Sequence, residues 1–474
     1  MRQVIVVYDD RIKPNREIAA ITGQKSYGKT IFKRKTLREM IEAEAGCVED
    51  FEETLLFLKN WPEQTVFCHL FSAYGIKDRA EFAILLKKAA YSHQIYTADC
   101  EGRPAMGIFP SVSSYREFIQ ASETDALLMI RRLKEETQLP SEAFMDLSNR
   151  NEFLKFITSG FEARFFNALS GDEYTVTKRS ANKLKIKSEY TFYHLLPDTM
   201  KMWFVMPFDY REEADSASYT MERLHVTDIA IRYVHGAVEP DEMKDILKKL
   251  FRFIADRERK AVSEAEYRSV TERLYIRKVE ERIAQLKESS SFQRFESFIR
   301  SGTDYSGIDE IVEKYRKLYY ASLGKVSHKP ELVIGHGDLC FSNILYQKEA
   351  GLLKLIDPKG CLVEQELYTD PYYDLAKLSH SICGNYDFFN SGLYQVVLGQ
   401  DMKFHLAVDA DNREYAEIFK GYLKESGFDY RMVRIYEASL FLSMLPLHMD
   451  REQKVFALLL NAAGILERLE LQKG

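Results

Sequence analysis

LVIGHGDLCFSNILYQKEAGLLKLIDPKG, residues 332–360, carries the strongest structural and chemical signals of this 474-residue chain. Its two apolar runs, LVI and LLKLI, predict short β-strands that each end in polar side chains. Asp338 and Asn343 follow the first run, five residues apart across a tight loop, and Asp357 follows the second. In phosphoryl transfer from ATP, one carboxylate accepts the proton of the attacking hydroxyl, while an amide and a second carboxylate hold Mg²⁺. The order and spacing therefore predict Asp338 as the catalytic base and Asn343 and Asp357 as the magnesium ligands.

The same stretch resembles the aminoglycoside phosphotransferase and choline kinase-like families, which are distant relatives of the protein kinases. Their catalytic loop reads H-G-D-x-x-x-x-N, as residues 336–343 do, and their metal-binding aspartate follows a second strand, where Asp357 stands. A downstream D-P-x-x-D-L-A segment of these families is matched by residues 370–376. The resemblance implies an α+β bilobal protein kinase-like fold, with a small antiparallel sheet lobe at 150–225 and a mostly helical large lobe at 226–474.

The small lobe is predicted to be a five-stranded antiparallel sheet, with strands at 152–157, 164–169, 173–178, 201–207 and 218–224. By the resemblance, Lys178 at the end of the third strand contacts the ATP phosphates, and Glu189 of the following helix pairs with it. A solvated lysine and glutamate are the alternative. The connection after the first strand is expected to cover the triphosphate, although a plain hairpin fits it equally, and residues 221–225 are expected to hold the adenine. The predicted nucleotide-binding residues are Lys178, Glu189, Ser159, Gly160, Glu222 and Leu224.

Residues 1–145 are predicted to form a separate α/β domain. The octet GQKSYGKT at 23–30 satisfies the phosphate-loop pattern GxxxxGK[ST], but its bulky Lys25 and Tyr27 disfavour a backbone that wraps a phosphate. The domain resembles the sugar nucleotidyltransferases more closely, through the helix entry at 28–41. Their metal-holding aspartate has no counterpart here. We therefore expect a degenerate domain of that shape, which serves packing, assembly or substrate presentation.

Composition narrows the class of protein. Hydrophobic residues make up 46% and charged residues 29% of the chain, which is typical of a globular protein. The net charge of −6 argues against a nucleic-acid partner, and no apolar run is long enough to span a bilayer. The N-terminus lacks the apolar core of a signal peptide and the six cysteines form no CxxC pair, so we expect a cytoplasmic protein with reduced thiols. The sequence does not indicate an oligomeric state.

Together these features predict an ATP- and Mg²⁺-dependent small-molecule kinase that transfers the γ-phosphate to a hydroxyl group. The fused domain favours a sugar or another precursor of a capsule or cell-surface polysaccharide as the acceptor. A choline- or ethanolamine-type kinase is an alternative, because five aromatic residues could cage a quaternary amine: Tyr372, Tyr373, Tyr386, Phe388 and Phe389. A bifunctional kinase and nucleotidyltransferase is compatible with the two-domain pattern, and so is a catalytically inactive, pseudokinase-like scaffold. Against the scaffold, an inactive protein need not keep Asp338 together with both magnesium ligands.

Overall fold

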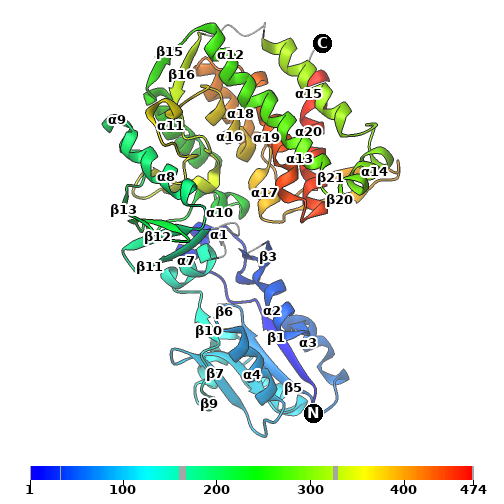
Figure 1. Ribbon diagram of the computed structural model, residues 1–474. Coiled ribbons are helices and arrows are strands. Elements are labelled where there is room, and N and C mark those ends of the chain that lie inside the picture. The colour runs from blue at the N-terminus through cyan, green and yellow to red at the C-terminus, as the bar shows by residue number, and fades with distance from the viewer. Residues whose placement is uncertain (1, 33, 160–166, 324–328, 472–474) are drawn as a thin grey trace. The chain divides into compact units, whose positions relative to one another are not determined.

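The computed structural model describes residues 2–32, 34–159, 167–323 and 329–471. The chain divides into two compact units (Figure 1). The first comprises residues 1–161 with 235–237, and the second comprises residues 162–234 with 238–474.

The first unit is built on a six-stranded mixed sheet with the strand order β4-β1-β5-β8-β7-β9. Its strands are β1 (Val4–Asp9), β4 (Val48–Asp50), β5 (Val66–Phe71), β7 (Tyr96–Cys100), β8 (Arg103–Phe109) and β9 (Thr137–Leu139). β1 is parallel to β4 and β5, whereas β8 is antiparallel to β5 and β7. β1 and β5 are almost entirely buried, and apart from Asp9 and His69 their residues are apolar or aromatic without polar alternation.

Seven helices and two short strand pairs complete the described part of this unit. The helices are α1 (Arg16–Thr22), α2 (Leu37–Ala45), α3 (Phe51–Phe57), α4 (Arg79–Ala89), α5 (Val112–Ala121), α6 (Ala126–Leu133) and α7 (Arg150–Ser159). The strand pairs are β2 (Ile31–Phe32) with β3 (Lys35–Thr36), and β6 (Tyr74–Ile76) with β10 (Phe144–Asp146).

A buried polar cluster lies at the end of β1 in the first unit. His69 Nε2 lies 3.1 Å from Asp9 Oδ2, and His69 Nδ1 lies 2.8 Å from the Tyr115 hydroxyl. All three side chains are fully buried, and Arg11 forms an ion pair with Asp9 at 2.6 Å. The Asp9 carboxylate is therefore committed to two protein partners, Arg11 and His69.

The octet at 23–30 does not have the surroundings of a phosphate loop. It follows helix α1 rather than a strand, and it contains the short 3₁₀ helix η1 (Tyr27–Lys29). The Gly28 N–H donates to Asp10 Oδ1 at 3.0 Å, and the Ser26 hydroxyl donates to Asp10 Oδ2. A carboxylate thus occupies the place where a phosphate would accept these bonds, and it would repel one.

The small lobe of the second unit is a four-stranded antiparallel sheet with the order β11-β12-β14-β13. Its strands are β11 (Asn167–Gly171), β12 (Thr175–Ser180), β13 (Pro207–Glu212) and β14 (Ala217–Glu222). Helix α8 (Lys183–Leu195) covers one face of the sheet, where Ile186 packs with Ala217 and Tyr219. This sheet and helix position the lysine and glutamate predicted to bind nucleotide.

Two of the five strands predicted for this lobe are wrong. Residues 152–157 belong to helix α7, because Phe153, Phe156 and Ile157 bury one helical face at a spacing of three and four residues. Residues 201–206 form the end of the short helix α9 (Asp198–Lys201) and a loop, in which Phe204 makes a single bridge with Leu355. Of the predicted strand at 164–169, residues 164–166 lie outside the described residues.

The predicted loop over the triphosphate is not confirmed. Ser159 is the last residue of α7, and Gly160 lies outside the described residues. Both nucleotide contacts assigned to this connection stay predictions.

The large lobe is mostly helical, as predicted. Its helices are α10 (Ile229–Val234), α11 (Pro240–Asp256), α12 (Glu264–Glu272), α13 (Lys278–Lys287), α14 (Phe292–Gly302), α15 (Ile308–Leu323), α16 (Tyr373–Ile382), α17 (Tyr386–Asn390), α18 (Arg413–Glu425), α19 (Tyr430–Met444) and α20 (Glu452–Leu471). Its strands are β15 (Arg259–Ala261), β16 (Glu331–Ile334), β17 (Ile344–Gln347), β18 (Leu352–Leu355), β19 (Tyr368–Thr369), β20 (Tyr394–Leu398) and β21 (Phe404–Val408). Among the described residues, no helix is both long and apolar enough to cross a membrane.

The two apolar runs of residues 332–360 both form strands. The first is β16, which pairs with β15 and β19, and the second is β18, which forms a hairpin with β17. The buried helix α16 packs against α19 in the centre of the lobe. The catalytic loop therefore lies between two small sheets and a helix whose side chains are almost all inaccessible to solvent.

Candidate active site

Lys178 joins the small lobe to the end of β18. Its Nζ lies 2.7 Å from Glu189 Oε2 on α8 and 2.8 Å from Asp357 Oδ1. Lys178 is only 2% exposed, and Tyr219 donates a hydrogen bond to the same Glu189 oxygen at 3.0 Å. Burial lowers the pKa of Lys178, but the charges of Asp357 and Glu189 outweigh it and hold that pKa above its ordinary value. The ammonium group is therefore charged, as its predicted contact with the ATP phosphates requires.

Asp338 and Asn343 contact each other across the loop between β16 and β17. Asn343 Nδ2 donates to the main-chain oxygen of Asp338 at 2.8 Å and to its Oδ2 at 3.1 Å. Lys377 of α16 approaches the other carboxylate oxygen, at 2.9 Å. Burial lowers the pKa of Lys377, but the Asp338 charge outweighs it and raises that pKa above its ordinary value. A fixed cation beside the predicted base can stabilise negative charge on a transferring phosphoryl group.

His336 orders the catalytic loop through both ring nitrogens. Nδ1 accepts the Asp338 N–H at 3.1 Å, so Nε2 carries the proton and donates to the Ile356 carbonyl at 2.9 Å. Burial lowers the pKa of His336, and the ring stacks on Phe204 with 5.8 Å between centroids. Ile356 also donates its N–H to the Asn343 carbonyl at 3.0 Å. A neutral histidine thus connects the predicted catalytic loop to the segment that carries Asp357, the predicted metal ligand.

A buried ion pair between Asp374 of α16 and Arg257, the residue after α11, supports the same loop. Asp374 accepts hydrogen bonds from the main-chain N–H groups of His336 at 3.0 Å and Gly337 at 2.8 Å. Arg257 lies 3.2 Å from Asp374, and both side chains are completely buried. Gly337 has a φ of 78°, and a Cβ there would lie 2.6 Å from the Cβ of Lys359. The backbone of the loop is therefore fixed by charge on one side and by close packing on the other.

Replacing Arg257 should destabilise the second unit. In Arg257→Met, Asp374 keeps its burial but loses its counter-ion, and we expect the free energy of unfolding to fall by about 3–5 kcal/mol. The matched control is Arg259→Met, which removes an exposed ion pair with Glu331 and should cost less than about 1 kcal/mol. Urea unfolding followed by tryptophan fluorescence, in a Trp61→Phe background so that Trp203 alone reports, measures both variants. Equal losses in the two variants would show that Arg257 does not brace the loop.

The segment after β18 is seated on helix α8. Asp357 has a φ of 55°, a left-handed conformation that aspartate tolerates better than most residues, and its side chain is 41% exposed. Gly360 has a φ of 82°, and a Cβ there would lie 2.7 Å from the carbonyl carbon of Ser188. Cys361 donates its N–H to the Ser188 carbonyl at 3.0 Å. These contacts keep Asp357 in position next to Glu189, the neighbour of Ser188.

The predicted adenine-binding residues lie at and just beyond the end of β14. Glu222 is the exposed last residue of the strand, and Leu224 is half-buried. The Leu224 carbonyl accepts a hydrogen bond from the Val226 N–H at 2.8 Å. It is therefore already used in a local turn, and an adenine contact at these residues stays a prediction.

Direct contacts join Lys178 to Glu189 and Asp357, and Asn343 to Asp338. The main-chain bond from Ile356 to Asn343 links these two sets of predicted site residues. Sequence reasoning missed two charged residues of the site, Lys377 and Arg257. Lys377 carried a recognisable signal, because it follows Asp374 by three residues and so shares its face of α16. Arg257 carried none, because its partner lies 117 residues further along the chain.

A model of the DUF1679 family, described as "Uncharacterized oxidoreductase dhs-27", matches residues 139–378. No curated protein matches the sequence.

Similar solved structures include a thermostable mutant of the aminoglycoside phosphotransferase APH(4)-Ia, at 10% identity over 68% of this chain and 99% of that chain, with a TM-score of 0.36. The ethanolamine kinase of Plasmodium vivax is 11% identical over 68% of this chain and 87% of that chain, also with a TM-score of 0.36. APH(3'')-Id of Streptomyces rimosus, in complex with ADP and streptomycin, is 15% identical over 64% of this chain and 98% of that chain, with a TM-score of 0.35.

The fold of the second unit follows from its own elements. An antiparallel sheet carries the lysine, the next helix carries its glutamate partner, and a helical lobe carries the H-G-D loop and the following aspartate. This is the bilobal protein kinase-like fold predicted from the resemblance to aminoglycoside phosphotransferases and choline kinases. Because the matching model extends over just over half of the chain, the chain belongs to the DUF1679 family, described as "Uncharacterized oxidoreductase dhs-27".

Proposed function

We propose that the protein is an ATP- and Mg²⁺-dependent kinase that phosphorylates a hydroxyl group of a small molecule. The observation that carries the proposal is the direct contact of Lys178 with both Glu189 and Asp357, with the Asp338–Asn343 pair on the adjoining loop. Each of the groups that phosphoryl transfer requires is present. They are a cation that can bind phosphate and the carboxylate that holds it in place, two oxygen ligands for a hard metal ion, and a carboxylate base.

Each of the two proposed metal ligands has one side-chain oxygen atom available to bind a metal ion. Among the described residues, Asn343 Oδ1 and Asp357 Oδ2 have no hydrogen-bond partner, because Asn343 donates through its nitrogen and Asp357 uses Oδ1 for Lys178. Amide and carboxylate oxygens are the ligands that Mg²⁺ prefers. When bound, the ion would neutralise charge on the ATP phosphates.

The remaining side chains then have distinct roles. Lys178 binds and orients the phosphates, and Glu189 holds Lys178 in place. Asp338 would orient the acceptor hydroxyl and take its proton as the hydroxyl oxygen bonds to the γ-phosphorus, while the bond from that phosphorus to the β,γ-bridging oxygen breaks and ADP leaves. Lys377 places a second cation beside that reacting oxygen.

An oxidoreductase activity, as the family description names it, is less well supported by the residues of this chain than a kinase activity is. A nicotinamide cofactor is commonly bound by G-x-G-x-x-G at a turn between a parallel strand and a helix. Within residues 139–378 the nearest pattern begins at Gly335 and Gly337 but has Cys340 at its third position. The named strands that pair within the described part of this range are antiparallel.

For the acceptor, we propose a sugar or another precursor of a surface glycan, phosphorylated in the cytoplasm. The first unit supports this substrate class through its mixed sheet, which has the strand and helix pattern expected of a nucleotide-sugar-binding domain. Choline or ethanolamine is the alternative acceptor. It is disfavoured because Tyr372, Tyr373, Tyr386, Phe388 and Phe389 are all buried in the large lobe.

The test is release of ADP from Mg·ATP with a panel of sugars, amino alcohols and amino acids. We expect acceptor-dependent ADP release that stops when EDTA removes magnesium. Lys29→Ala, in the octet of the first unit, should leave it unchanged, because the amide next to that lysine already binds Asp10. Loss of ADP release in Lys29→Ala would place the reaction in the first unit instead. Oxidation of an alcohol with NAD or NADP, without ADP release, would overturn the proposal that the protein is a kinase.

A further inference from the structure

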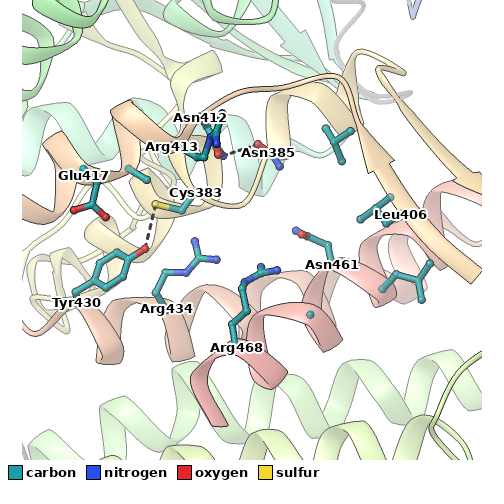
Figure 2. Close-up of a pocket in the computed structure, with 14 residues that line it drawn as sticks. Cys383, Asn385, Leu406, Asn412, Arg413, Glu417, Tyr430, Arg434, Asn461 and Arg468 are labelled. Carbon is teal, nitrogen blue, oxygen red and sulfur yellow. Dashed lines mark hydrogen bonds between the residues drawn. The ribbon is translucent and has the colours of Figure 1, made fainter. Parts of the chain in front are cut away.

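The large lobe contains a cavity of about 760 Å³ that the proposed reaction does not use. It is lined by residues of α18, α19, α20 and β21 and by the segment after α16, as Figure 2 shows. Its volume lies within the range of about 300–1,000 Å³ that is usual for small-molecule sites. A cavity of this size is large enough to hold a small molecule whose chemistry matches that of the lining residues.

Two arginines from neighbouring helices point into this cavity. Arg434 of α19 is 6% exposed, whereas Arg468 of α20, which lies beside it in Figure 2, is more exposed to solvent. Burial and the charge of Arg434 both lower the pKa of Arg468, so the two guanidinium groups repel each other. Arg434 has one carboxylate partner, Glu437, at 2.6 Å. An anion placed between the two arginines would offset that repulsion.

A third arginine, Arg413, lines the same cavity from α18. It forms an exposed ion pair with Asp411 at 2.8 Å, outside the lining. Among the described lining residues, Glu417 is the only acidic one. The lining is therefore cationic in a protein whose net charge is −6.

Amide groups add hydrogen-bonding capacity on the opposite wall. Asn412 Nδ2 donates to Asn385 Oδ1 at 2.7 Å, and this bond leaves the Asn385 amide hydrogens without a partner among the described residues. The Asn385 amide lies across the space from the arginines in Figure 2, as in a site built for oxygen ligands. Asn461 lies on α20, the helix of Arg468, and donates its Nδ2 to the Gly384 carbonyl at 2.9 Å.

We infer that this cavity binds a small molecule through an anionic group, a phosphate or a carboxylate, held between Arg434 and Arg468. Guanidinium groups bind both anions with two parallel N–H···O bonds, and the burial of Arg434 strengthens the bonds that this residue would make. Inorganic ions and the charged end of a larger metabolite present the same chemistry to the arginines.

The cavity is separate from the proposed phosphoryl-transfer site, and it adjoins the C-terminal end of α16, the helix that carries Lys377. Lys377 contacts Asp338, whereas Cys383, which lines the cavity, comes six residues later. At 1.5 Å per residue these two positions are about 9 Å apart along the helix axis. The binding proposal does not depend on the kinase activity, since the arginines would hold an anion in either case.

Calorimetric titration of the full-length protein tests the site, with inorganic phosphate and succinate as separate probes up to about 10 mM. Titrations are repeated with saturating Mg·AMP-PNP, so that phosphate bound at a nucleotide site is told apart from phosphate bound here. We expect binding of at least one probe that persists with AMP-PNP, and Arg468→Gln should weaken it by about tenfold or more. Binding seen without AMP-PNP and lost with it would overturn the proposal.

The matched control is Arg316→Gln on α15, which removes the same charge from an exposed ion pair with Glu280. It should bind the probes as the wild type does. Arg434→Lys, which keeps a cation for Glu437, should also weaken binding because lysine lacks the forked geometry. Circular dichroism verifies that each variant is folded. No binding of either probe by the wild type, or equal affinity in Arg468→Gln and Arg316→Gln, would overturn the proposal.

Discussion

Asp338→Asn is expected to lower the rate of phosphoryl transfer by about 10²–10⁴-fold, the usual contribution of a positioned base. The substitution keeps the shape of the side chain but removes its ability to accept the hydroxyl proton. It also replaces one carboxylate oxygen by an amide nitrogen, so that either Asn343 Nδ2, the donor at Oδ2, or Lys377 Nζ, the donor at Oδ1, loses its acceptor. The Asp338 side chain is 43% exposed, so the fold should tolerate the change.

Acceptor-dependent ADP release measures the rate, and calorimetry measures the affinity for Mg·ATP, which should change little. Asp309→Asn is the matched control, since Asp309 is an exposed acid on α15 that pairs with Lys287. Both control quantities should equal those of the wild type. Wild-type turnover in Asp338→Asn would remove Asp338 from the role of base.

The parts of the site that lie close together in sequence could be predicted, because local geometry fixes them. Asp338 and Asn343 are joined by one short loop, and a two-stranded hairpin then leads to Asp357. Lys178 and Glu189 were predictable in the same way, since a strand and the helix directly after it bring them together. In each case the chain has little room to place the side chains elsewhere.

Features that depend on distant packing could not be predicted. The run at 152–157, E-F-L-K-F-I, is compatible with a strand as well as with a helix. Only its burial in the core of the first unit determines that it forms helix α7. Arg257 resembles any other arginine at the end of an amphipathic helix until Asp374 is placed beside it. The cavity around Arg434 and Arg468 needs three helices, and no segment of sequence contains that information by itself.

Asp357→Ala should have an effect on binding as well as on the rate. The substitution removes a proposed magnesium ligand and also one of the two carboxylates that contact Lys178. We expect magnesium-dependent affinity for ATP to fall by more than about 100-fold, since even the loss of an indirect metal contact costs about 10–100-fold. Turnover should be lost with it. This pattern differs from that of Asp338→Asn, where binding persists.

Two further variants separate metal binding from effects on the backbone. Asp357→Asn tolerates the left-handed φ of 55° and keeps an oxygen, but it lacks the charge, so its affinity for Mg·ATP should lie between those of the wild type and Asp357→Ala. Glu364→Ala removes an exposed acid seven residues later and should bind Mg·ATP normally. Calorimetric titration with ATP, in magnesium and in EDTA, gives the magnesium-dependent part of the ATP affinity for each protein. If Asp357→Ala binds Mg·ATP as tightly as Glu364→Ala does, the metal ion is held elsewhere, and Asp357 serves only to fix Lys178.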